Sequence, residues 1–289
     1  MKRFFIIFAS AVAIGVTAHA HAFDIGQAVS SGIGGVQQIA EASKDITPSE
    51  EHYIGRAVAA MIIDQYPLLG NAALDQYVNK VGLVVAYHSD RPVTYGGYHF
   101  AVLRSDEVNA FAAPGGFIFI TRGLLKSIQN EDQLANVLGH EIAHVAERHG
   151  IGAIKKSRWT KFGFYAAGEV GKQYSSSEVG QLAAEFQSVV SDVAKQVIQS
   201  GYSKKDENQA DELGMKFAAA SGYSPKAMED FIKSEIASGY SSKSGPFSSH
   251  PSPDKRLKEV EGDLKDITPD NGVDQARTAR FKQTLAAMR

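Results

Sequence analysis

Residues 140 to 144 read His140-Glu141-Ile142-Ala143-His144, a stretch of the form H-E-x-x-H. On an α-helix, two residues four positions apart project from almost the same line of the surface, because one turn takes about 3.6 residues. The two imidazoles can therefore reach one metal ion, and the glutamate beside the first of them is placed to handle protons. Because the chain contains nine histidines, this pattern can also arise by chance. It is suggestive alone and becomes strong evidence only together with the neighbouring residues.

The neighbouring residues predict an amphipathic helix over about 131–149. Asn130 can cap its N-terminus, with Gln133 as the capping-box partner. The apolar stripe of this helix consists of Leu134, Leu138, Ile142 and Val145. A second stripe holds small residues, namely Ala135, Gly139, Ala143 and Ala146. This stripe either allows another element to approach closely or reflects ordinary tight packing.

The N-terminus has the features of a secretory signal peptide, which we expect to comprise residues 1–22. A basic start precedes a short apolar run over 4–16, and small-x-small sites allow cleavage after Ala20 or Ala22. The run is shorter than the roughly 20 residues of a transmembrane helix, so a retained anchor is the lesser alternative. Loss of the two basic side chains changes the formal net charge from −2 to −4.

The chain contains no cysteine, which excludes disulfides, thiolate metal sites, cysteine nucleophiles and a lipidated cysteine anchor. After signal cleavage about 265 residues remain, enough for one large domain with a substantial core. No later segment is apolar over a length that crosses a membrane, and the charges give no sign of nucleic-acid binding. We therefore expect a soluble protein of the bacterial periplasm.

Upstream of the motif, the pattern predicts a leader segment, two helices and one strand. Residues 23–46 contain several glycines and are expected to be loosely structured. Apolar residues recur at helical spacing over 48–66 and again over 72–87. Residues 98–104 alternate in polarity and are rich in strand formers, so a β-strand is expected there.

Two strand-like runs flank Pro114-Gly115-Gly116 and predict a β-hairpin. The second run, 117–121, is continuously apolar and suits an interior strand. The first run, Asn109-Ala110-Phe111-Ala112-Ala113, is short and mostly made of small residues. It suits an exposed edge whose backbone can pair with an extended peptide, although an ordinary hairpin is the alternative. A helical turn over 122–128 then leads into the motif helix.

Residues 150–202 differ in composition from the rest of the chain. Glycines alternate with aromatic residues, and an amphipathic helix follows over about 179–197. We expect a mobile, partly apolar insertion. Its helix is either part of the core or a lid over the site.

A catalytic zinc site usually has three protein ligands and one water, so two histidines require a third ligand elsewhere. A metzincin would carry glycine at position 147 and histidine at position 150, but these positions hold Glu147 and Gly150. His149 comes one position too early and falls on the apolar stripe of the motif helix. We interpret it as a core or helix-end histidine.

A carboxylate on a later helix is the alternative, and the best candidates lie in Glu207-Asn208-Gln209-Ala210-Asp211. Glu207 and Asp211 are four residues apart and share one helix face. One of them could bind zinc while the other accepts the free N–H of a zinc histidine, which would fix the orientation of that ring. Taken alone, the pair could equally be two solvated carboxylates on a surface helix.

Together, these motifs resemble the zinc endopeptidase family of the CAAX prenyl endopeptidase and the heat-shock protease HtpX, the forty-eighth metallopeptidase family. The likeness is greatest to its soluble periplasmic branch, of which BepA is an example. It covers about residues 50–260. The motifs that carry it occur in the family's order and are NAFA at 109–112, PGG at 114–116, TRGLL at 121–125, HEIAH at 140–144, ENQAD at 207–211 and SHPSP at 249–253, with Arg256 after it.

The resemblance implies an α+β, mainly helical fold of gluzincin type, with a small β-sheet or hairpin over the motif helix. It implies one zinc ion per chain. The implied ligands are His140, His144 and Glu207. Glu141 would act as the general base and acid. Asp211 would accept a hydrogen bond from a zinc histidine. Arg256 would also lie next to the zinc ligands without binding the metal itself.

The resemblance also implies that residues 109–113 lie above the metal as the strand that pairs with substrate. His250 would lie near the site, contacting the transition-state oxyanion or occupying the metal's open position in a latent form. A loop histidine held by neighbouring prolines is the alternative. We expect the peptidase domain to span 47–262 and a helical tail to span 263–289. No helical-repeat domain is recognisable there, so partner roles that depend on such repeats are not transferred.

The expected function is zinc-dependent hydrolysis of peptide bonds in extended or misfolded exported or outer-membrane proteins, as part of periplasmic quality control. The substrate comes from the family resemblance alone. The expected partners are unfolded polypeptides, including outer-membrane proteins or their assembly machinery. Two alternatives stay open, a zinc amidase acting on cell-wall peptides and a non-catalytic holdase or assembly factor with a structural zinc.

Overall fold

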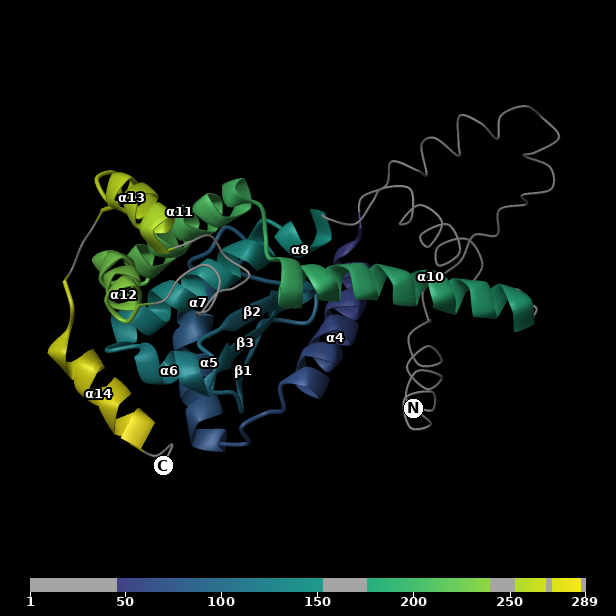
Figure 1. Cartoon of the computed structure of the whole chain (residues 1–289), viewed down its shortest axis with the longest axis horizontal. Coiled ribbons are helices and arrows are strands. Elements are labelled where there is room, and N and C mark those ends of the chain that lie inside the picture. The colour runs from purple at the N-terminus through teal and green to yellow at the C-terminus, as the bar shows by residue number, and fades with distance from the viewer. Residues whose placement is uncertain (1–45, 153–175, 240–252, 269–271, 287–289) are drawn as a thin grey trace. The chain divides into compact units, whose positions relative to one another are not determined.

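A computed structural model describes residues 46–152, 176–239, 253–268 and 272–286 (Figure 1). The chain divides into two compact units, and the described part of the first is the N-terminal portion of α10 (Ser176–Lys195), up to Ser188. The other described residues belong to the second unit. The signal peptide, nearly all of the leader, residues 153–175 of the insertion and His250 lie outside the described residues.

The second unit begins with two capped helices. Thr47 caps α4 (Pro48–Gln65) through a capping box with Glu50, and a proline occupies the first helical position. Asn71 caps α5 (Ala72–Tyr87), where its side chain accepts a hydrogen bond from the backbone N–H of Leu74 at 3.1 Å. Both helices are predicted from the apolar periodicity, and both predictions are confirmed.

Three strands form a sheet in the order β1-β3-β2. β1 (His99–Leu103) runs parallel to β3 (Phe117–Thr121), and β2 (Ala110–Ala113) runs antiparallel to it. The turn η1 (Pro114–Gly116) joins β2 to β3, and its two glycines have φ values of 74° and 102° that other residues rarely adopt. The predicted hairpin is confirmed, and β3 is the interior strand.

β2 lies at the edge of the sheet, as expected, but its side chains are not exposed. All four are buried, and η2 (Gln196–Ser200), the π-helical segment that continues α10, packs against the strand. Phe111 also packs against the ring of Tyr66, with the centroids 5.2 Å apart. The expectation of an exposed edge is therefore wrong for the side chains, because the small residues of this strand let neighbouring segments approach closely.

α6 (Arg122–Ser127) leads into α7 (Glu131–Ala146), which carries the H-E-x-x-H stretch. Asn130 caps α7 as predicted, but the side chain of Gln133 bonds the N–H of Gln129 at 2.8 Å and not that of Asn130. The helix ends at Ala146 and not at residue 149, because Arg148 has a left-handed φ of 58°. The next residue starts the short helix α8 (His149–Gly152).

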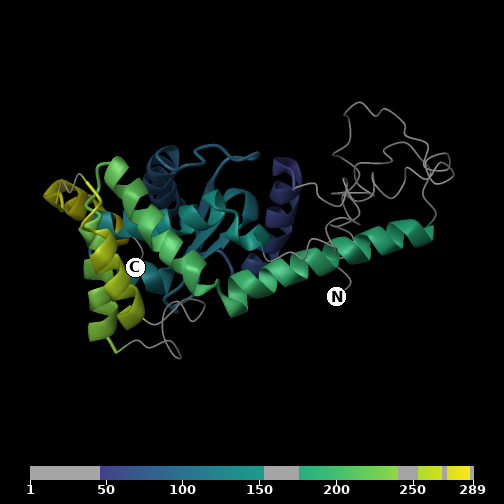
Figure 2. The same cartoon turned by 90° about the horizontal axis from the view of Figure 1, so that it is seen from above.

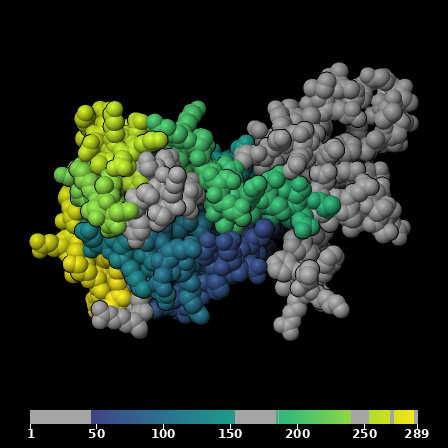
Figure 3. Space-filling model, viewed as in Figure 1, coloured from purple at the N-terminus to yellow at the C-terminus, as the bar shows by residue number. Residues whose placement is uncertain are grey.

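α7 is buried along almost its whole length and is the centre of the second unit. The elements packed against it include α5, β2, β3, α11 (Lys204–Ala220), α12 (Lys226–Ala237) and α14 (Gln275–Ala286). α13 (Pro253–Asp263) packs on α11 and α12. Figure 2 shows the green α11 beside the teal α7, and in Figure 3 the yellow and green C-terminal segments border the teal middle of the chain.

The predicted fold class is confirmed, since a mainly helical unit surrounds one small sheet that packs on the motif helix. The C-terminal turns of α10 are buried at Val189, Val190 and Val193, so this part of the predicted amphipathic helix contributes to the packed second unit. Within the described residues, no helix combines the length and the hydrophobicity needed to cross a bilayer.

Candidate active site

Three buried side chains bring their ligand atoms together, two from α7 and one from α11. They are His140, His144 and Glu207, here called the metal group. The Nε2 atoms of the two histidines are 3.1 Å apart, and each lies 3.7 Å from an oxygen of Glu207. Ligand atoms about 2 Å from one tetrahedral centre lie about 3.3 Å from each other, so the spacing suits zinc. In the described parts of the chain, no other set of three such residues converges in this way.

Glu207 reaches the motif helix because α11 begins beside it and then lies directly against it. Ser203 caps α11 through a capping box with Asp206, which places Glu207 in the first helical turn. Further along, Gly214 lies so close to α7 that a Cβ added there would be 2.6 Å from the backbone nitrogen of His140. The predicted stripe of small residues on α7 therefore serves a close helix contact.

Asp211, one turn after Glu207, orients the first metal histidine. Nδ1 of His140 lies 2.8 Å from Oδ1 of Asp211, so this N–H donates to the carboxylate and Nε2 remains for the metal. Arg256 of α13 donates to the same carboxylate through Nε at 2.9 Å and Nη2 at 2.6 Å. Although burial opposes ionisation, the charge of Arg256 and the hydrogen bonds from His140 and Arg256 hold the pKa of Asp211 well below its usual range.

Glu141 lies in the same buried region and has an oxygen available for a proton. Its Oε1 is buried and has no hydrogen-bond partner among the described residues. Burial, and then the negative charge of Glu207, raise the pKa of Glu141 to about 8, and burial raises the pKa of Glu207 to about 7. A divalent cation would offset the cost of ionising these two buried carboxylates, because a nearby positive charge favours their ionised form. The residues present therefore fit a zinc ion.

The backbone of β2 has one edge that β3 does not use. The carbonyl of Asn109 accepts a hydrogen bond from the N–H of Thr121 at 3.0 Å, and alternate residues of an antiparallel strand point away from the partner. Ala110 and Ala112 therefore direct their N–H and C=O groups to the other edge, while the strand's remaining residues face β3. At that edge, the N–H of Ala110 donates to the Asn109 side chain at 2.9 Å.

Tyr202 occupies part of this edge, a position that the sequence did not indicate. Its hydroxyl lies 3.4 Å from the carbonyl oxygen of Ala112, and its ring stacks on His144 with the centroids 4.1 Å apart. Burial, and then the charges of Glu141 and Glu207, raise the pKa of Tyr202, so the hydroxyl stays protonated. No motif marks this tyrosine, and its position shortly before Glu207 is the one signal that could have indicated it.

His149 also has a place that the sequence did not indicate. Its placement on the apolar stripe of α7 is wrong, because the helix ends before this residue, whereas the expectation of a core or helix-end histidine agrees with its burial. Its side chain is mostly buried and turned toward the metal group, with Nδ1 at 2.8 Å from Nδ1 of His144. A continuous helical pattern hid this position, since nothing in the residue types forces the left-handed conformation of Arg148.

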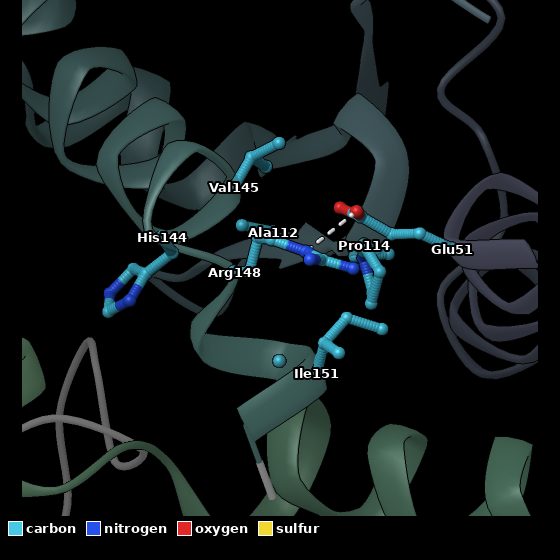
Figure 4. Close-up of a pocket in the computed structure, with 9 residues that line it drawn as sticks. Glu51, Ala112, Pro114, His144, Val145, Arg148 and Ile151 are labelled. Carbon is cyan, nitrogen blue, oxygen red and sulfur yellow. Dashed lines mark ion pairs between the residues drawn. The ribbon is translucent and has the colours of Figure 1, made fainter. Parts of the chain in front are cut away.

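A buried carboxylate on α4, Glu51, connects the segments on both sides of the site. It forms ion pairs with Arg148 at 3.0 Å and Arg91 at 2.8 Å, and it accepts a hydrogen bond from the N–H of Gly115 at 3.1 Å. Figure 4 shows Arg148 reaching toward Glu51 while His144 points away from this pair. Glu51 thereby links η1, which follows the edge strand, to the chain that leaves α7.

Comparison with known proteins places the chain among metallopeptidases. The sequence model of Peptidase family M48 matches residues 72–263. The beta-barrel assembly-enhancing protease of Escherichia coli (strain K12) is 26% identical over 242 residues, 79% of this chain and 46% of that protein. The protease of the same name from Yersinia pestis is 30% identical over 219 residues, 70% of this chain and 41% of that protein. The mitochondrial metalloendopeptidase OMA1 of Schizosaccharomyces pombe is 30% identical over 163 residues, 55% of this chain and 44% of that protein.

These alignments cover less than half of each of the three relatives. The family match, by contrast, covers more than half of this chain, from the start of α5 to the end of α13, and includes every residue of the metal group. Metalloproteases of this family use zinc, which the buried metal group could bind. The chain therefore belongs to peptidase family M48.

Proposed function

We propose that this chain is a zinc-dependent endopeptidase. The observation that carries the proposal is the buried metal group with the carboxylate of Glu141 in the same buried region, one oxygen of which has no hydrogen-bond partner among the described residues. A structural zinc site is closed by four protein ligands, whereas a group of three leaves one position for water or substrate. Membership of a peptidase family supports the same activity.

The chain's residues would divide the chemistry among them. The metal group would hold zinc, with both histidines using Nε2. When bound, the ion would polarise the peptide carbonyl and make a water acidic near neutral pH. Glu141 would take the water's proton at Oε1 and return it to the leaving amine nitrogen. Asp211 would keep His140 in the tautomer that leaves Nε2 for the metal, and Arg256 would keep Asp211 ionised.

The substrate would bind as an extended strand along the unused edge of β2. The backbone groups that face this edge belong to Ala110 and Ala112, and the Asn109 side chain would have to release the N–H of Ala110 before it could pair. Such pairing recognises the main chain with little preference for side chains. Of the predicted segment 109–113, these two residues would therefore make the pairing bonds. Tyr202 would have to release the carbonyl of Ala112 before a peptide could pair along the whole edge.

Misfolded exported proteins, including outer-membrane proteins, are the substrates that we propose in the bacterial periplasm. The signal-peptide pattern of residues 1–22 supports export, and two relatives are named as beta-barrel assembly-enhancing proteases.

The predicted domain bounds, 47–262 for the peptidase and 263–289 for the tail, are also part of the proposal. So is a role for His250 at the oxyanion or at the metal's open position.

The test is Glu141→Gln, assayed on casein as an unfolded protein and for zinc content by elemental analysis. The variant should keep one zinc per chain and the wild-type unfolding midpoint, and lose about 10²-fold or more in kcat/KM. Glu212→Gln, a half-exposed glutamate on α11 that pairs with Lys216, is the matched control and should cleave normally. Wild-type cleavage by Glu141→Gln would refute the mechanism.

The wild-type protein separates the alternatives in the same assay. Cleavage of purified cell-wall peptides without cleavage of casein would show an amidase. Zinc binding with neither activity would show a holdase or assembly factor with a structural zinc. Glu207→Ala should bind no zinc at the concentration that saturates the wild type, and undiminished zinc would show that another group provides the third ligand.

A further inference from the structure

The two metal histidines are held by partners of different chemistry. Nδ1 of His140 donates to a buried carboxylate, Asp211, which is itself bound by Arg256. Nδ1 of His144 instead lies 2.8 Å from Nδ1 of His149, a second imidazole. The function proposed above assigns no role to this imidazole.

The geometry determines which nitrogen carries each proton. Nε2 of His144 faces His140 and Glu207, so it is the nitrogen left for the metal, and Nδ1 carries the hydrogen of the neutral ring. His149 must then accept at Nδ1 and carry its own hydrogen on Nε2. That nitrogen faces Oε1 of Gln209 at 3.4 Å, an amide oxygen that can only accept. The next bond runs outward too, because Nε2 of Gln209 donates to Glu147 at 2.7 Å.

The backbone holds His149 in this place independently of the metal group. Arg148, directly before it, has a φ of 58°, which turns the chain back after α7. The guanidinium of Arg148 pairs with buried Glu51 at 3.0 Å (Figure 4), and it also donates to the carbonyl of Ile46. His149 is thus fixed by the main chain on one side and by Gln209 of α11 on the other.

We propose that His149 is a positioning residue for zinc binding, and that Gln209 in turn sets the tautomer of His149. The proposal rests on the zinc site proposed above and concerns the protein's affinity for the ion. His149 would do for His144 what Asp211 does for His140, through a neutral acceptor in place of a charged one. It would touch neither the metal nor the substrate.

Two substitutions separate the hydrogen bond from the packing of the ring. His149→Phe keeps an aromatic ring, which in the wild type meets the ring of His144 edge-on at 5.0 Å, but it removes the acceptor. His149→Asn loses the ring but places an amide oxygen close to the position of Nδ1. His99→Phe is the control, because His99 is an exposed histidine of β1, at the opposite edge of the sheet from β2.

The measurements are the zinc dissociation constant, from competition with a chromophoric chelator, and the urea midpoint of the zinc-free protein. His149→Phe should bind zinc about 10- to 100-fold more weakly, with an unchanged midpoint. His149→Asn should recover most of that loss, and His99→Phe should bind like the wild type. Wild-type affinity in His149→Phe would overturn the proposal, as would an equal loss in both His149 variants. Failure of the wild type to bind zinc would instead refute the zinc site itself.

A second measurement needs no variant and remains decisive if His149→Phe does not fold. In the zinc-loaded, ¹⁵N-labelled wild type, the proton on Nδ1 of His144 should show a scalar coupling across the hydrogen bond to Nδ1 of His149. Gln209→Leu should move the proton resonances of His149 and weaken zinc binding less than His149→Phe does. A ring of His149 with its hydrogen on Nδ1 would overturn the proposal, because that nitrogen could not accept.

Discussion

Gly139 of α7 and Gly214 of α11 meet backbone to backbone. A Cβ at Gly139 would lie 2.6 Å from the carbonyl oxygen of Gly214, a separation that real side chains do not show. Gly139 directly precedes His140, and Gly214 follows Asp211 by one turn. The contact therefore sets how close the carboxylates of α11 come to the metal histidines. Glycine costs each helix about 1 kcal/mol relative to alanine. In return, the absence of a side chain lets the two helices approach each other closely.

Gly214→Ala should separate the two helices. We expect a loss of about 1–3 kcal/mol in the free energy of unfolding, because backbone atoms cannot yield to the added methyl group. Zinc binding should weaken as well, because Glu207 and Asp211 move with α11. Gly262→Ala is the control, since a Cβ in that position of α13 meets no atom within 4 Å, and it should be neutral or stabilising. Urea unfolding with excess chelator and a zinc titration measure both effects, and wild-type values for Gly214→Ala would contradict this account.

Arg256→Met should be among the most destabilising single changes. It leaves the carboxylate of Asp211 buried and ionised with no cation, which costs about 3–5 kcal/mol in buried pairs. Arg256→Lys should recover little, since one ammonium cannot replace the two parallel bonds of the guanidinium. The double variant Asp211→Asn with Arg256→Met should be more stable than Arg256→Met alone, because its buried charge is gone. Urea unfolding of the zinc-free proteins orders the three, and a double variant that is less stable would show that the charge is not the cause.

Local patterns explain why much of the architecture could be predicted from the sequence. The apolar periodicity of α4 and α5, the glycine turn at 115–116 and the i, i+4 spacing in α7 each depend on residues close in the chain. The third member of the metal group is distant in sequence. The shared helix face of Glu207 and Asp211 indicated two candidate carboxylates, and only the family resemblance pointed to Glu207, which the structure brings to the histidines.

What could not be predicted depends on single backbone angles and distant contacts. The φ of Arg148 moves His149 off α7, yet arginine there is compatible with a continuing helix. Tyr202 reaches the site because η2 packs on β2, a contact between segments far apart in the chain. The burial of β2 has the same origin. Residue types that are unremarkable in sequence thus acquire their positions from tertiary packing.

Glu235 of α12 should make the folded protein less stable as pH rises. Both of its oxygens are buried, and neither has a hydrogen-bond partner in the part of the chain that the structure describes. Burial raises its pKa from the ordinary 4.5 to about 7, opposed by the charge of Arg256. The folded state therefore binds this proton more tightly than the unfolded chain does. Its contribution is fully present below about pH 4.5 and is lost as pH rises through about 7.

Glu235→Gln removes this titration and keeps the shape of the side chain. At pH 8 the variant should be more stable than the wild type, by up to about 3 kcal/mol, and at pH 5 the difference should nearly vanish. Asp230→Asn, at an exposed position of the same helix, should show no such dependence. Urea unfolding of the zinc-free proteins at both pH values provides the test. A constant difference between Glu235→Gln and the wild type would mean that Glu235 does not titrate in this range.

α14 is attached to the start of the motif helix by two ion pairs that should differ in strength. Arg280 pairs with buried Glu131, and Arg277 pairs with buried Asp132. Glu131 also accepts hydrogen bonds from the hydroxyls of two tyrosines, at 2.7 and 3.2 Å. Asp132 has one backbone N–H at 2.9 Å besides Arg277, and its Oδ2 has no hydrogen-bond partner among the described residues.

Arg277→Ala should therefore cost more stability than Arg280→Ala, although each removes one ion pair. The Arg280 side chain is 55% exposed and its partner keeps other donors, so we expect a loss of less than about 1 kcal/mol. The Arg277 side chain is 20% exposed, donates to the carbonyl of Gly222 at 2.7 Å and lies 4.9 Å from the ring centre of Tyr223. Its removal leaves Asp132 buried without a cation, at a cost of about 2–3 kcal/mol. Urea unfolding of the two variants ranks the losses, and a larger loss for Arg280→Ala would show that exposure and alternative donors do not decide the strength of these pairs.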